Sequence, residues 1–190
     1  FKPGPVGVFT TLCQDRYHAA SSRVPAGPAR QDLTMTPLSR IELLQQMPVF
    51  GAIRTDILEF LLARTRMVEV PQGGFYFHQG DPGDAMYVLE SGHVEVLKRG
   101  ADGTPRVLSR LGRGDCFGEM ALIDLAARSA SVRAGDACAA IEITAANLMS
   151  VYEHDIEQFA LIQMNMGREV SRRLREVDEQ LFQLLSRAGS

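Results

Sequence analysis

The chain has 190 residues, of which 45% are hydrophobic, and its formal net charge is −3. This length and composition fit one folded domain with extensions, and the small negative charge predicts no general attraction to nucleic acid or to an anionic membrane. No stretch approaches the roughly 18 apolar residues of a transmembrane helix, and no basic region followed by an apolar core begins the chain. We therefore expect neither a membrane partner nor a secretory signal.

The cysteines are scattered along the chain. Cys13, Cys116 and Cys138 show no Cys-x-x-Cys spacing, and the four histidines share no ligand spacing. This scattering argues against a zinc site, an iron–sulfur cluster and a disulfide framework. We expect buried or incidental thiols in a reducing cytosol, a cytoplasmic location, and no bound metal or cofactor.

The first 62 residues are predicted to form a tail followed by two short helices. Residues 1–34 are rich in Pro, Gly, Ala, Ser and Arg and have no apolar period. We interpret 1–37 as a tail that is either disordered or was added for expression. Apolar residues then recur at helical spacing over 38–47, and a second helix is predicted over 56–62 with Thr55 as its N-cap.

From Met67 onward the pattern is that of short β-strands. Runs rich in β-branched and aromatic residues are separated by Gly and Pro, and the segment 100–105, with its Asp-Gly pair, predicts a hairpin turn. Many short strands at this spacing predict a sandwich or a barrel. The predicted strands cover 67–70, 75–78, 86–89, 93–97, 106–111, 131–134 and 138–143.

Two helices are predicted after the last strand, one from the cap Thr144 to about Tyr152 and one over roughly 155–186. Apolar residues of the second helix alternate in steps of four and three, which predicts a coiled-coil seam that one small barrel cannot cover. We therefore expect residues 153–190 to form a homodimer helix. The seam comprises Val170, Leu174, Val177, Leu181 and Leu184, and Phe159, Ile162 and Met166 are expected to extend it upstream with one extra step.

Two groups of charged residues receive ordinary roles. Asp81 and Asp84, which together with Glu90 suggest a metal cluster, are better explained by turn chemistry. A basic run on the last helix is interleaved with acidic residues, so we expect a solvated, salt-bridged flank rather than a nucleic-acid stripe. The run comprises Arg168, Arg172, Arg173 and Arg175.

The most informative segment places a glycine, a carboxylate and an arginine close together in the chain. Gly118 lets the backbone approach an anion, and a helix that begins there directs free N–H groups and a positive dipole end at the same spot. Arg128 can neutralise that anion with a forked guanidinium. Glu119 is suited to accept hydrogen bonds from ribose hydroxyls.

Residues 117–123 and 128–132 resemble the phosphate-binding cassette of the cyclic nucleotide-binding domain family, and 80–96 resembles that family's upstream strand–turn–strand signature. The resemblance implies a mainly β plus α fold in which 38–152 form an antiparallel, jelly-roll-like β-roll with N-terminal helices. A long C-terminal helix, similar to the dimerisation helix of catabolite activator relatives, follows the roll. The implied ligand contacts are Gly118, Glu119, Met120, Ala121, Arg128, Ser129 and Ala130. Ser129 either caps a turn or places its hydroxyl near the phosphate or the base edge.

The loop 124–127 departs from the family pattern. Ala127 stands where many members have proline, and Asp124 adds negative charge beside the expected phosphate. This departure keeps one alternative open, in which the domain has lost ligand binding and serves as a dimeric interaction scaffold. A second alternative, the sensory fragment of a larger regulator, also stays open.

The resemblance implies a function in signalling rather than catalysis. We expect a sensor that binds cAMP or cGMP, with cAMP favoured, and that relays binding through its C-terminal helices. Because the chain stops at Ser190, we expect no helix-turn-helix after the dimerisation helix and no direct DNA binding. The downstream protein partner is not deducible from the sequence.

Overall fold

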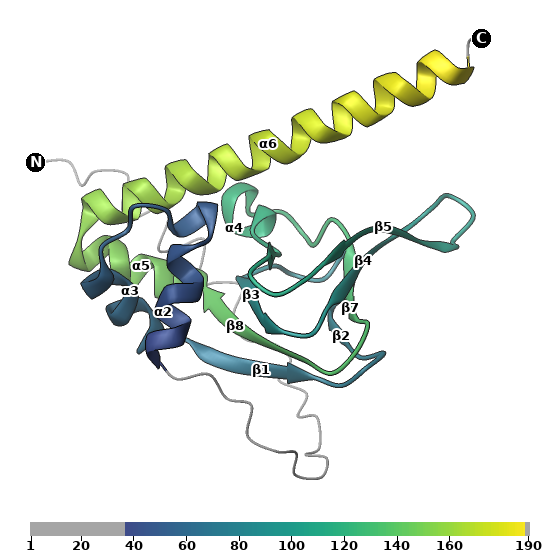
Figure 1. Cartoon of the computed structure of the whole chain (residues 1–190). Helices are drawn as coiled ribbons and strands as arrows, with labels where there is room; N and C mark the ends of the chain where they lie inside the picture. The colour runs from purple at the N-terminus through teal and green to yellow at the C-terminus, as the bar shows by residue number, and fades with distance from the viewer. Residues whose placement is uncertain (1–36, 189–190) are drawn as a thin grey trace, which may run out of the picture. The chain divides into compact units, whose positions relative to one another are not determined.

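The computed structural model describes residues 37–188, which form two antiparallel four-stranded sheets with helices before and after them (Figure 1). The strand order is β1-β8-β3-β6 in the first sheet and β2-β7-β4-β5 in the second. The predicted fold class, an antiparallel β-roll with N-terminal helices and a long C-terminal helix, is confirmed. The strands are β1 (Arg66–Val70), β2 (Phe75–Phe77), β3 (Ala85–Ser91), β4 (Val94–Arg99), β5 (Pro105–Leu111), β6 (Cys116–Phe117), β7 (Ser131–Ala134) and β8 (Cys138–Thr144).

The helices match the expected ones closely, with one correction at a cap. The prediction that Thr55 is an N-cap is wrong: Arg54 takes the N-cap position, and Thr55 is the first residue of the helix. The Thr55 hydroxyl instead accepts a hydrogen bond from Gln45 Nε2 at 3.1 Å. The predicted cap Thr144 is confirmed, since its hydroxyl accepts the Asn147 backbone N–H at 3.1 Å. The helical elements are α2 (Pro37–Gln45), η1 (Pro48–Phe50), α3 (Thr55–Leu62), α4 (Met120–Asp124), α5 (Ala145–His154) and α6 (Ile156–Ala188).

Two apolar cores hold the layers together, and β3 contributes to both. Its residues alternate between the two faces of the sheet. Met86 and Val88 join the core shared with the helices, whereas Ala85, Tyr87 and Leu89 join the core between the sheets. The aromatic side chains that support the candidate site belong to the second core.

The helix α6 begins on the body of the domain and ends away from the roll (Figure 1). Ile162 and Met166 are fully buried, and Phe159 packs against the same core. The expectation that these three residues extend the dimer seam is therefore wrong, because they complete the core of their own domain. Asn165 Nδ2 also donates to the Gly51 carbonyl oxygen at 2.9 Å, which ties this half of α6 to the chain after η1. Among residues 37–188, no helix combines the length and the apolar character that crossing a bilayer requires.

Candidate functional site

The candidate site is built on the segment that links β6 to β7. Gly118 has a φ of +82°, and a Cβ at this position would lie 2.7 Å from Arg128 Nη1 and 3.2 Å from the Ala85 carbonyl oxygen. Glycine is the residue that accepts this conformation and this crowding without strain. The predicted helical turn after Gly118 is confirmed and forms α4.

The unusual loop after α4 has its own turn chemistry. Leu125 has a φ of 55°, a left-handed conformation that costs a non-glycine residue about 1–2 kcal/mol. The Asp124 carboxylate accepts the backbone N–H of Ala126 at 3.0 Å. The negative charge that departs from the family pattern is thus used to form a turn.

Arg128 follows this loop, and it is 4% exposed. Nη1 donates to the Gly118 carbonyl oxygen at 2.9 Å, and the guanidinium carbon lies 4.1 Å from the centre of the Phe77 ring. Nε is buried and has no hydrogen-bond partner among residues 37–188. Burial lowers the pKa of Arg128 from its ordinary value, although the nearby Tyr87 and Asp84 act in the opposite direction. A bound anion would satisfy both the buried charge and the free donor.

The upstream glycine-rich turn holds Arg128 from another side. The Arg128 backbone N–H donates to the Asp81 carbonyl oxygen at 2.9 Å. A Cβ on Gly83 would lie 2.2 Å from the Cβ of Ala121, so this turn packs directly on α4. The His78 backbone N–H donates to the Asp81 carboxylate at 2.7 Å, which confirms the predicted turn role of Asp81. The two segments that carry the family resemblance therefore meet at Arg128.

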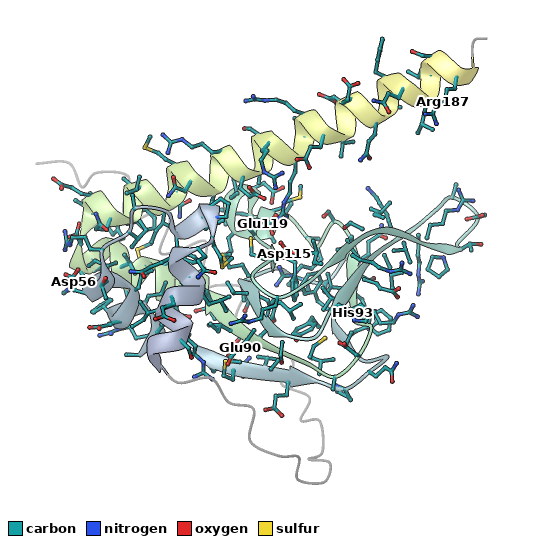
Figure 2. All side chains as sticks on the ribbon, in the orientation of Figure 1. Asp56, Glu90, His93, Asp115, Glu119 and Arg187 are labelled. Atoms are coloured by element: carbon teal, nitrogen blue, oxygen red, sulfur yellow. The ribbon has the colours of Figure 1, made fainter. Side chains whose placement is uncertain are left out.

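Glu119 is engaged by the long helix. It is 3% exposed, and its Oε1 accepts a hydrogen bond from Arg173 Nη1 of α6 at 2.7 Å (Figure 2 labels Glu119 close to α6). Arg173 also donates to Glu169 at 2.9 Å and to the Cys116 carbonyl oxygen at 3.1 Å. Burial acts to lower the pKa of Arg173, but the carboxylates of Glu119 and Glu169 raise it overall. A ribose that binds Glu119 must share this carboxylate with Arg173 or displace it.

The remaining predicted contacts lie around these two groups. Ala121 and Ala130 are buried, whereas Met120 and Ser129 are exposed. The Ser129 hydroxyl donates to the Met120 sulfur at 3.9 Å, so the residue after Arg128 lies beside α4. Of the predicted contacts, Gly118 and Arg128 are therefore joined by a hydrogen bond, whereas the Glu119 carboxylate bonds to Arg173 of α6.

Sequence reasoning missed the role of Arg173. The predicted salt-bridged flank is present, since Arg172 pairs with Glu169 at 2.7 Å. The Arg173 side chain is 32% exposed, however, and it reaches a carboxylate 54 residues earlier in the chain. Its place in a run of alternating charges resembled that of a solvated residue, and no local spacing points to Glu119.

The two cysteines within residues 37–188 are buried. Cys116 and Cys138 are buried and free, as expected, and Cys13 lies outside the described residues. Burial raises the pKa of the Cys116 thiol to about 12, which keeps it protonated and a poor nucleophile at neutral pH. Within residues 37–188, no group of three His, Cys, Asp or Glu side chains is arranged to hold a metal ion.

Comparisons with known proteins agree with this geometry. The sequence profile of the cyclic nucleotide-binding domain matches residues 67–155. The chain is 33% identical to the cyclic AMP receptor protein of Thermus thermophilus over 138 residues, which is 70% of this chain and 60% of that protein. It is 28% identical to the CRP-like cAMP-activated global transcriptional regulator of Mycobacterium tuberculosis over 144 residues, 76% of this chain and 62% of that protein. The chain thus spans about 60% of the length of these relatives.

A solved structure shows the same architecture. The crystal structure of the Thermus thermophilus catabolite activator protein superposes with a TM-score of 0.64 at 31% identity, covering 72% of this chain and 62% of that one. Cyclic nucleotide-binding domains are regulatory rather than catalytic, which confirms the prediction that this domain is not an enzyme. Residues 67–155, with the helices around them, therefore belong to the cyclic nucleotide-binding domain family and are homologous to the sensor domains of catabolite activator proteins.

Proposed function

We propose that this chain is a cytoplasmic sensor that binds a cyclic purine nucleotide, cAMP in preference to cGMP, and relays binding through α6. The observation that carries the proposal is the side chain of Arg128, which is buried and cationic and whose Nε has no hydrogen-bond partner in the described part of the chain. A cyclic phosphate carries one negative charge and acceptor oxygens, so it complements this group. The names of the relatives, which refer to cAMP, support the preference.

The Glu119 carboxylate links the proposed ligand site to α6 and so provides the proposed relay. Arg173 of α6 donates to it in the structure, and ribose hydroxyls are the natural competing donors. A nucleotide that binds Glu119 changes the contact between α4 and α6, and it favours whichever helix position leaves the carboxylate available. Such a ligand biases a two-state element by binding one state better.

The proposed sensor is a homodimer. The seam side chains Leu174, Val177, Leu181 and Leu184 are between 52% and 63% exposed. A row of exposed apolar residues on one helix face calls for a partner surface. The same helix of a second copy fits this row, because its steps of four and three are those of a coiled coil.

Titration calorimetry with cAMP and cGMP tests the proposal. We expect wild-type protein to bind at least one nucleotide with a dissociation constant in the micromolar range or tighter. Arg128→Ala leaves the phosphate without its buried cation, which costs on the order of 2–5 kcal/mol, so affinity should fall at least about thirtyfold. Arg106→Ala is the control, since Arg106 is an exposed hairpin residue paired with Asp102, and its affinity should match the wild type. Absence of heat with both nucleotides in wild-type protein would contradict the proposal.

A dimeric interaction scaffold is the second candidate. The observation that favours it is the hydrogen bond from Arg173 to Glu119, because the carboxylate that would accept the ribose hydroxyls already has a charged partner. The scaffold predicts a stable dimer that takes up neither nucleotide. The titration separates the two candidates, because both predict a dimer and only the sensor binds a nucleotide.

A further inference from the structure

Four side chains form a row across the first sheet that ends at the cassette. Arg66 on β1 is in register with Glu142 on β8, Glu142 with Tyr87 on β3, and Tyr87 with Phe117 on β6. Side chains in register on neighbouring strands lie on the same face and contact one another. We call these four residues the transverse row. Phe117, its last member, directly precedes Gly118 of the site.

Each neighbouring pair in the transverse row makes a specific contact. Arg66 Nη2 donates to Glu142 Oε1 at 3.0 Å, and its Nε donates to the other carboxylate oxygen. The Tyr87 hydroxyl donates to Glu142 Oε1 at 3.1 Å. The rings of Tyr87 and Phe117 are stacked, with centres 5.4 Å apart and an interplanar angle of 17°. The row is therefore linked from the edge of the sheet to the start of the cassette.

The inner end of the row also supports Arg128. Phe77 lies 6.0 Å from Tyr87 and 6.1 Å from Phe117 between ring centres. The guanidinium of Arg128 lies over this same Phe77 ring. A tilt of the Tyr87 ring would therefore displace both Phe77, which lies under Arg128, and Phe117, which directly precedes Gly118.

Burying the Glu142 carboxylate costs desolvation free energy, which a purely structural role would not require. Glu142 is 6% exposed, and a buried carboxylate contributes little net stability, even when paired, compared with an apolar residue of similar size. We propose that Glu142 and Tyr87 are positioning residues of the nucleotide site: Glu142, held by Arg66, fixes the Tyr87 ring, and this ring sets the positions of Phe117 and Phe77 around Arg128. This inference rests on the proposed function, because it assigns the row an effect on nucleotide affinity.

Three substitutions test the transverse row by calorimetric titration with cAMP. Tyr87→Phe removes the hydroxyl and keeps the ring, and we expect affinity to fall about fivefold. Glu142→Gln should lose less, because its amide oxygen still accepts the Tyr87 hydroxyl. The double variant should be no weaker than Tyr87→Phe, since both changes act on one link. Tyr76→Phe is the matched control, because the buried Tyr76 hydroxyl has no hydrogen-bond partner among residues 37–188, and its affinity should equal the wild type.

A ligand-free measurement separates this inference from the proposed function. The Nε–H resonance of Arg128 in a nitrogen-15 correlation spectrum is assigned by its loss in Arg128→Lys. We expect Tyr87→Phe to shift this resonance and Tyr76→Phe to leave it in place. If wild-type protein binds no nucleotide but Tyr87→Phe shifts the resonance, the row still positions Arg128 and the proposed function fails.

The inference is overturned by a different result. If Tyr87→Phe lowers the melting temperature but keeps both the wild-type affinity and the Arg128 resonance, the row is merely structural. Should Tyr87→Phe fail to fold, Arg66→Gln replaces it as the probe, because the Arg66 side chain is 74% exposed and Glu142 keeps the Tyr87 hydroxyl as a donor. Arg66→Gln should then shift the Arg128 resonance from its wild-type position, and an unchanged resonance overturns the inference equally.

Discussion

The two halves of α6 both carry regularly spaced apolar residues, but they meet different surroundings. In the first half Ile162 and Met166 are fully buried in the core of their own domain. In the second half Leu174 is 59% exposed and Leu181 is 52% exposed. The comparison teaches that spacing identifies an apolar face, whereas tertiary packing decides whether that face completes the domain or remains for a partner.

A cluster of charges marks the boundary between the two halves. Glu169 is 6% exposed and bonds both Arg172 and Arg173, and Arg173 continues to Glu119 in the candidate site. The point where the docked half ends is thus also the point where α6 contacts the cassette. In the proposed sensor, a nucleotide that binds Glu119 acts on α6 at this boundary.

The largest expected effect comes from charging the exposed half. Leu174→Glu combined with Leu181→Glu removes two apolar contributions of roughly 1.5–3 kcal/mol each and places carboxylates in the proposed seam. Sedimentation equilibrium at micromolar concentration should then give the monomer mass of 20.9 kDa. Phe182→Glu is the control, because this residue is 66% exposed and stands outside the seam, and it should stay dimeric. A wild-type mass near that of the monomer would contradict the proposed dimer.

The docked half should respond to truncation in the opposite way. In the monomeric background above, Ile162→Ala should lower the free energy of unfolding by about 2–5 kcal/mol, since it opens a cavity in a packed core. Leu184→Ala in the same background should change it by less than about 0.5 kcal/mol, because the site is exposed. Urea denaturation measures both. Equal losses would mean that the second half also packs on its own domain.

The boundary cluster should show an intermediate effect. Arg173→Ala leaves the buried Glu119 carboxylate without this donor, and the free energy of unfolding should fall by about 1–3 kcal/mol. Arg175→Ala, an exposed arginine two residues along the same helix, should change it by less than about 0.5 kcal/mol. Matching values for the two variants in urea denaturation would show that the contact with Glu119 adds no stability.

The smallest effect is a pH dependence at the same boundary. Hydrogen bonds from Arg172, together with the charges of Arg173 and Arg172, lower the pKa of Glu169 despite its burial. A carboxyl group whose pKa is lowered by folding stabilises the protein above its unfolded pKa of about 4.3, and this contribution is lost as the pH falls through the folded pKa. The stability difference between wild type and Glu169→Gln should therefore shrink between pH 7 and pH 3. A difference that stays constant over this range would remove Glu169 from the acid response.

Much of the architecture follows from local patterns in the sequence. Alternating short runs separated by Gly and Pro predict the strands of the roll, because side-chain direction in a strand repeats every two residues. The cap at Thr144 and the turn at Asp81 were predictable, since each depends on a side chain and a backbone group only three residues away. The two-residue strand β6 was missed, because a run this short has no period.

The candidate site also has parts that local sequence predicts and parts that it does not. The sequence by itself determined its local parts, namely Gly118, α4 and Arg128, because these parts lie in one short segment whose spacing carries the family resemblance. Tertiary structure decided the partners of its charged groups. Glu119 meets Arg173 and Tyr87 meets Glu142 across separations of 54 and 55 residues. Hydrogen bonds of this kind depend on which strands pair and where a helix docks, and a local residue pattern does not encode either choice.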